Sequence, residues 1–261
     1  MIVSASYHDD IPAHYAAWFM RRLDAGYCRT FDRSGLRFHR VALSRDAVDA
    51  FVFFTRHAAP FEQALDAVRA RGYAFVLQYG ITSIPEVERF RALSVRHGAR
   101  ALVWRYEPLR LTETETSAWH EANFARLAQA LRGATDEVIV SIDVGTAHAR
   151  SLLKQLARIA AGVGMRFSLC SQPESLVPGA YPARCIDARR VAALTGAAVD
   201  EATAARWGGC LCATASDIGT APVEAGRGAA LAPPSPLHDP HGEFLLPPPP
   251  MPVTESADLP F

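Results

Sequence analysis

The sequence predicts an α/β fold of about six βα units, wound as a TIM-barrel-like parallel (βα) barrel that is either partial or closed. Two observations support this prediction. Short apolar runs rich in β-branched and aromatic residues recur over the first 200 or so residues. Longer segments with helical spacing of apolar residues separate them. This alternation is typical of a parallel sheet, which right-handed crossovers wind into a barrel or an open doubly wound sheet.

Each predicted strand is short and mostly apolar, as expected of a strand that is buried on both faces. The region from about residue 28 to 45 interrupts the rhythm, and Phe38–Leu43 within it is expected to form an extra hairpin strand. No G-x-G-x-x-G follows the first strand, which argues against a dinucleotide-binding sheet. The six strands are expected at Ile2–Ala5, Phe51–Thr55, Tyr73–Tyr79, Ala101–Tyr106, Glu137–Ile142 and Met165–Cys170.

The helices are predicted from apolar spacing and from residues that favour helix ends. Asp10 is a suitable N-cap for the first helix, and Pro12 is tolerated in its opening turn. Ser83 to Glu86 form a capping-box pattern at the start of another helix. The apolar positions that define four of the helices are Ile11, Tyr15, Trp18, Phe19 and Leu23; Val87, Phe90 and Leu93; Trp119, Leu127 and Leu131; and Leu152, Leu156, Ile159 and Val163.

Composition predicts one domain over residues 1–220 and a proline-rich tail over 221–261 that lacks regular structure. A polyproline site for a partner protein is the alternative interpretation of the tail. The chain has 27 basic and 27 acidic residues and a formal net charge of zero, so nothing in the charge balance indicates nucleic acid or a membrane as partner. The five cysteines and the lack of a signal-peptide pattern predict a cytoplasmic protein.

Polar residues follow the predicted strands, where parallel α/β domains bind ligands. We expect a small-molecule site there, with Arg105 binding an anionic group and Asp10, Glu107 and Asp143 serving as acid, base or hydroxyl acceptors. The alternative is that these residues are helix caps and surface groups, with Arg105 and Glu107 forming a simple ion pair. No H-E-x-x-H, G-x-S-x-G or Walker motif occurs.

Four cysteines are candidate metal ligands, because thiolates suit zinc and iron–sulfur clusters. Cys210 and Cys212 form a C-x-C pair, Cys170 ends the sixth strand and Cys185 lies in the following loop. The spacing is not that of a standard zinc motif, and thiols without a metal are the alternative. Cys28 stands alone and is interpreted as structural.

Several segments occur in an order that is typical of one family. They are Ser4 to Pro12, Phe53 to Pro60, Trp104 to Pro108, Cys185 to Asp187, Gly209 to Cys212 and Ser216 to Gly219. Together they resemble an uncharacterised bacterial family, DUF1848, which looks like a radical-SAM type of iron–sulfur protein. The resemblance covers most of residues 1–219, although Tyr7 and His8 replace the paired arginines of the family's opening segment.

The chain departs from this family after Gly219. The family carries a cysteine triad there, of a kind that binds a [4Fe–4S] cluster and S-adenosylmethionine, whereas residues 219–228 here contain no cysteine. A cluster needs thiolates, so the triad's cluster and S-adenosylmethionine are not carried over. The resemblance implies a second site at Cys170, Cys185, Cys210 and Cys212, for zinc or an iron–sulfur cluster. A non-catalytic binding protein and a metal-independent hydrolase or isomerase are the alternative functions.

Overall fold

A computed structural model describes residues 1–5, 10–31, 38–142, 147–170, 177–202 and 211–219. The predicted tail at 221–261, Asp143 and Cys210 lie outside these residues. Within them, the predicted alternation of strands and helices is confirmed. No helix in these ranges is long and apolar enough to cross a membrane.

The core of the fold is an eight-stranded parallel sheet with the order β10-β1-β4-β5-β6-β7-β8-β9. From β1 to β9, the strands of this sheet that follow one another along the chain are neighbours, and β10 lies beside β1. The described residues of the two outer strands, β9 and β10, do not pair, so the sheet they form is not closed. The strands are β1 (Ile2–Ala5), β4 (Ala50–Thr55), β5 (Ala74–Gly80), β6 (Leu102–Leu109), β7 (Glu137–Ile142), β8 (Arg166–Leu169), β9 (Tyr181–Pro182) and β10 (Ser216–Asp217).

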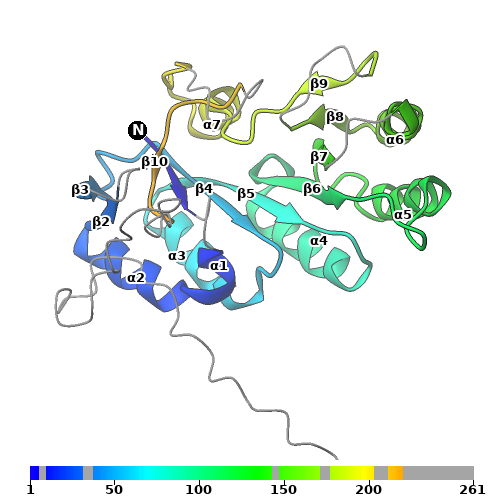
Figure 1. The fold of residues 1–261 in the computed structure, drawn as a ribbon. Coiled ribbons are helices and arrows are strands. Elements are labelled where there is room, and N and C mark those ends of the chain that lie inside the picture. The colour runs from blue at the N-terminus through cyan, green and yellow to red at the C-terminus, as the bar shows by residue number, and fades with distance from the viewer. Residues whose placement is uncertain (6–9, 32–37, 143–146, 171–176, 203–210, 220–261) are drawn as a thin grey trace, which may run out of the picture.

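Helices cover both faces of this sheet, as Figure 1 shows, with α7 on the face opposite the other helices. A two-stranded antiparallel hairpin, β2 (Tyr27–Phe31) and β3 (Phe38–Ala42), confirms the extra strand predicted there. The helices are α1 (Ile11–His14), α2 (Ala16–Ala25), α3 (Glu62–Ala70), α4 (Pro85–His97), α5 (Ser117–Ala130), α6 (Ala147–Gly162) and α7 (Ala188–Thr195), with short 3-10 turns at Ala59–Phe61 and Ala99–Ala101.

The two faces of the sheet differ in the size of their side chains, because residues alternate along each strand. The outer face packs large rings against the helices. Phe51 and Phe53 of β4, for example, meet Phe19 of α2 at centroid distances of 5.4 and 5.3 Å. The inner face begins with small aliphatic residues such as Ala74 and Val76, which are buried with α7. The room left by these small side chains accommodates α7.

Two predictions about where helices begin and end are wrong. The first predicted helix is interrupted at Tyr15, so α1 and α2 are separate. The capping box at Ser83 does not form, because α4 begins at Pro85 with Ile84 as its N-cap and has no side-chain cap. Glu86 instead accepts hydrogen bonds from the Tyr79 hydroxyl and from Arg89, which takes its carboxylate away from the helix end.

Candidate functional site: a cysteine cluster and a rim pocket

The inner face of the sheet changes from aliphatic to polar toward the carboxyl ends of the strands. On β5, Gln78 follows the aliphatic positions of the same face, and on β6 Arg105 and Glu107 follow Val103. Gln78 and Arg105 are buried, at 1% and 7% exposure. Buried polar groups are costly unless hydrogen-bonded, so their partners identify what this region is built to hold.

Arg105 forms the centre of this region. Its Nε and Nη2 atoms donate to the two carboxylate oxygens of Glu107, both at 2.5 Å, and its Nη1 approaches Cys185 Sγ at 3.2 Å. Nη1 also lies 3.5 Å from the side-chain oxygen of Gln78. Burial acts to lower the pKa of Arg105, but attraction to Cys185, Glu107 and Cys170 outweighs it and raises the pKa well above its ordinary value. Arg105 therefore stays charged beside the cysteines.

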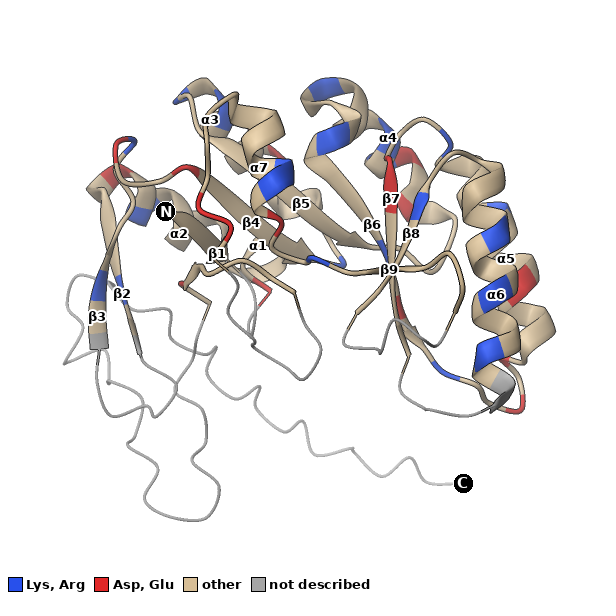
Figure 2. Ribbon diagram, turned by 90° about the horizontal axis from the view of Figure 1, so that it is seen from above, with Lys and Arg blue, Asp and Glu red and all other residues tan. Residues whose placement is uncertain are grey.

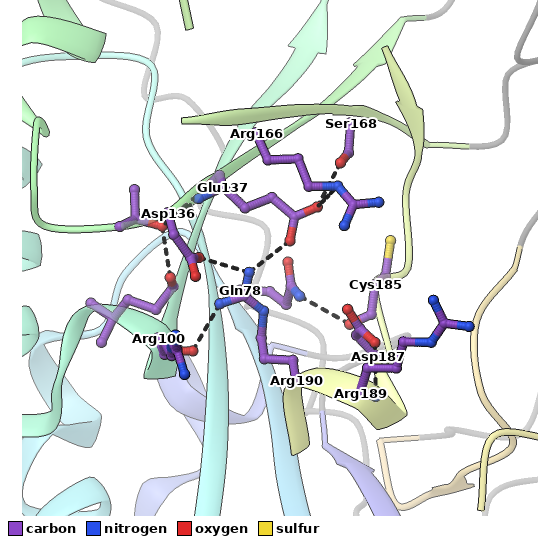
Figure 3. Close-up of polar contacts among 12 residues, drawn as sticks. Gln78, Arg100, Asp136, Glu137, Arg166, Ser168, Cys185, Asp187, Arg189 and Arg190 are labelled. Atoms are coloured by element: carbon purple, nitrogen blue, oxygen red, sulfur yellow. Dashed lines mark hydrogen bonds and ion pairs between the residues drawn. The ribbon is translucent and has the colours of Figure 1, made fainter. Parts of the chain in front are cut away.

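Three of the predicted cysteine ligands meet here. Cys170 follows β8 directly, and its Sγ lies 3.6 Å from that of Cys185. Cys185 also hydrogen-bonds Cys212, and its backbone carbonyl accepts from Gln78 Nε2 at 2.9 Å (Figure 3). The hydrogen bond with Cys170 lowers the pKa of Cys185, but the contact with Cys212 and burial raise it, and the net shift is upward. Cys28 is buried in the other core cluster, as its structural interpretation requires.

A buried ion network fixes α7, the helix that begins just after Cys185. Arg190 Nη2 lies 2.8 Å from both Asp136 Oδ1 and Glu137 Oε2, and Glu137 accepts a hydrogen bond from Ser168 at 2.6 Å. Figure 3 shows these side chains converging at the start of β7, and Figure 2 shows the acidic residues there and the basic residues of α7. The side chain of Asp187 caps α7 by accepting from the Arg189 amide. The Cys185 loop is thus attached to the sheet through α7.

A pocket of about 310 Å³ opens at the carboxyl ends of β5 and β6. It is formed by the last residues of β5 and β6, by loop residues after β4, β5 and β6, by Glu86 of α4 and by the first turn of α5. Glu107 lines it, so the Arg105–Glu107 pair extends from the cysteines to the pocket wall. Other lining residues are Arg56, Ser83, Arg110, Glu115, Trp119 and His120.

One wall of the pocket is held by a buried hydrogen-bond network that sequence reasoning missed. His120 Nε2 lies 2.8 Å from the carbonyl oxygen of Arg110, which only accepts, so Nε2 carries the hydrogen. Its Nδ1 then accepts from the Tyr106 hydroxyl at 2.9 Å, while Asn123 donates to the same hydroxyl at 3.3 Å. Burial raises the pKa of Tyr106 to about 12, although the bond with Asn123 lowers it.

Trp119 shows why this network was missed. We predicted it on the apolar face of its helix, but it is 41% exposed and lines the pocket, whereas the neighbouring His120 is buried. The spacing of His120 and Asn123, three residues apart and in phase with Leu127, is the signal that could have identified a buried polar face. Trp119 packs edge-on against His120, with ring centroids 4.9 Å apart.

Asp10 lies apart from the cysteines and takes a helix-capping position. Its Oδ1 accepts from the Ala13 amide at 2.9 Å, and its Oδ2 accepts from Thr55 Oγ1 and the Arg56 amide at 3.0 and 3.2 Å. The N-cap prediction is therefore confirmed, and Asp10 links α1 to the end of β4. Of the predicted catalytic set, the described residues bring Arg105 and Glu107 together.

The described cysteines do not by themselves complete a metal site. Within these ranges, no group of three or more His, Cys, Asp and Glu side chains is arranged to hold a metal ion. The sulfur separation of 3.6 Å is nevertheless close to the value of about 3.8 Å expected when two thiolates share one tetrahedral ion at about 2.3 Å each. In a [4Fe–4S] cluster each thiolate binds a different iron, which requires wider spacing. The pair therefore fits one shared ion better than such a cluster.

Comparison with known proteins gives one match. The family model described as Domain of unknown function (DUF1848) matches residues 2–222, which is most of the chain. No curated protein and no solved structure matches.

Proposed function

This chain belongs to the family described as Domain of unknown function (DUF1848), and we propose that it is a metal-thiolate protein with a small-molecule site at the adjoining rim. Cys170, Cys185 and Cys212 supply three thiolates, and Cys210, which lies outside the described residues, supplies the fourth. The observation that carries the proposal is the 3.6 Å separation between the sulfurs of Cys170 and Cys185. This separation favours two thiolates on one tetrahedral ion, such as zinc, over a [4Fe–4S] cluster, in which each thiolate binds a different iron.

Arg105 suits this role because thiolates are negatively charged. Metal ligation requires the thiols to lose their protons, and a fixed guanidinium 3.2 Å from Cys185 Sγ lowers the cost of that charge. On its other side, the positive charge of Arg105 is balanced by the carboxylate of Glu107. Zinc held by four thiolates has no open position for substrate, so the ion would stabilise the Cys185 loop and leave ligand binding to the pocket.

A metal-free binding protein is the second candidate. The upward shift in the pKa of Cys185, in which the hydrogen bond from Cys170 is outweighed by that with Cys212 and by burial, favours neutral thiols when no metal is bound. The rim pocket would then be the whole functional site. A metal-independent hydrolase or isomerase would use the same pocket, with Glu107 as the nearest carboxylate.

Metal and acid-labile sulfide analysis of protein purified without oxygen tests the proposal. We expect about one zinc per chain without sulfide. Cys185→Ser should lose the metal, whereas Cys28→Ser, a control in the other core cluster, should retain it. Detection of iron together with acid-labile sulfide would mean that the cysteines hold an iron–sulfur cluster and not zinc. No metal in the unaltered chain would leave the metal-free binding protein as the better account. Full retention of metal in Cys185→Ser would refute the cysteine site, because the metal would then be bound elsewhere.

A further inference from the structure

Two charged side chains of the rim pocket have no charged partner among the residues that the structure describes. Arg56, directly after β4, makes no hydrogen bond or ion pair through its guanidinium within the described part of the chain. Glu115, just before α5, makes none through its carboxylate there. No guanidinium nitrogen of Arg56 lies within 4.0 Å of a carboxylate oxygen of Glu115, although both side chains line the same pocket.

The other acidic residues of the pocket are already neutralised. Both carboxylate oxygens of Glu107 accept from Arg105. Glu86 accepts from the Tyr79 hydroxyl and pairs with Arg89. Arg110 also lines the pocket and has a partner of its own. Arg56 and Glu115 are therefore the lining charges that lack a counter-charge among the described residues.

Arg56 and Trp119 are both placed to face a ligand. The Arg56 side chain lies over Gly80, where a Cβ would come within 3.0 Å of Arg56 Cγ, so glycine leaves room for it. The ring of Trp119 is held edge-on against the buried His120, while the Thr116 side chain accepts from the Trp119 amide. This half-exposed indole offers an apolar surface beside the two charges.

We propose that the rim pocket binds a zwitterionic α-amino acid with an apolar or aromatic side chain. Arg56 binds its carboxylate, Glu115 binds its ammonium group and Trp119 covers its side chain. A guanidinium pairs with a carboxylate in a two-pronged geometry, and an aromatic ring also attracts a nearby ammonium group. The volume of about 310 Å³ is at the small end of ligand pockets, which suits an amino acid rather than a nucleotide.

This inference rests on the rim-site half of the proposed function and names its ligand class, but it does not require the metal. The probe is L-phenylalanine, titrated calorimetrically into the full chain. Two analogues each lack one charge: 3-phenylpropionate has no ammonium group, and 2-phenylethylamine has no carboxylate. We expect each analogue to bind at least about tenfold more weakly than L-phenylalanine, because a lost charge-assisted hydrogen bond leaves its partner unpaired.

Variants assign the two charges. Arg56→Gln should remove the advantage of L-phenylalanine over 2-phenylethylamine, and Glu115→Gln its advantage over 3-phenylpropionate. Glu113→Gln is the matched control, since Glu113 is an exposed residue of the same loop and does not line the pocket. Thermal unfolding of each variant verifies that it is folded.

The outcomes separate this inference from the metal centre. Equal affinity for L-phenylalanine and both analogues, no binding of any of them, or identical effects of Glu115→Gln and Glu113→Gln would overturn it. Cys185→Ser should lose metal yet retain L-phenylalanine binding. A chain that holds zinc but binds no amino acid refutes the ligand class and leaves the metal proposal standing.

Discussion

Replacing Arg190 by Met removes the cation that links α7 to the sheet while keeping a long apolar side chain. The Arg190 and Glu137 side chains are only 10% and 6% exposed. After the change, Glu137 keeps the hydrogen bond from Ser168 and an arginine, Arg166, at 3.9 Å. Removing one partner of a buried ion pair costs about 3–5 kcal/mol, and the two remaining contacts place the expected loss at the lower end, about 3 kcal/mol.

Urea unfolding measures this loss in free energy of unfolding, and the neighbouring Arg189→Met provides the control. Arg189 pairs with Glu201 at 2.8 Å, but these side chains are 65% and 54% exposed, so that change should cost far less than Arg190→Met. The double change Arg190→Met with Glu137→Met should be more stable than Arg190→Met alone, because no buried carboxylate is left unpaired; Asp136, the other partner of Arg190, is half-exposed. Equal stability of Arg190→Met and Arg189→Met would refute this account of α7.

Three further outcomes are expected. The pKa of Tyr106 is raised to about 12, so its contribution to stability should be present up to about pH 10 and be lost as pH rises from about 10 to 12. Ultraviolet titration of the chain and of Tyr106→Phe measures this pKa by difference. Asp10→Ala should cost about 1–2 kcal/mol in urea unfolding, since it removes the cap of α1, whereas Asp24→Ala, which breaks an exposed pair, should cost less than about 1 kcal/mol. Gly80→Ala should displace Arg56 and weaken L-phenylalanine binding several-fold with little loss of stability; unchanged affinity would contradict the placement of Arg56 over Gly80.

The main strands could be predicted because each is an apolar run buried on both faces. The β4 strand is the clearest example, since five of its six side chains are buried. The two-residue strands β9 and β10 could not be predicted, because periodicity needs more residues than they have. Their pairing depends on backbone hydrogen bonds to β8 and β1, which sequence pattern does not report.

The candidate site was predictable in kind but not in detail. Arg105 and Glu107 occupy alternate positions of one strand, so their shared face follows from strand geometry. The contact of Arg105 with Cys185 joins residues 80 apart in the chain, and no local pattern predicts it. Arg56 and Glu115 carry ordinary loop charges in the sequence, and only the pocket shows that they face the same space.

Two buried ion pairs on the same sheet face differ in what they hold together. Arg190–Glu137 joins α7 to the sheet, so its contribution is structural. Arg105 and Glu107 are two residues apart on one strand, and their pairing joins no separate elements. A buried pair is often no more stabilising than apolar side chains of similar volume, so stability alone does not account for it. What this pair does provide is a fixed positive charge at Cys185 and a carboxylate at the pocket wall, which is why we assign function to this end of the sheet.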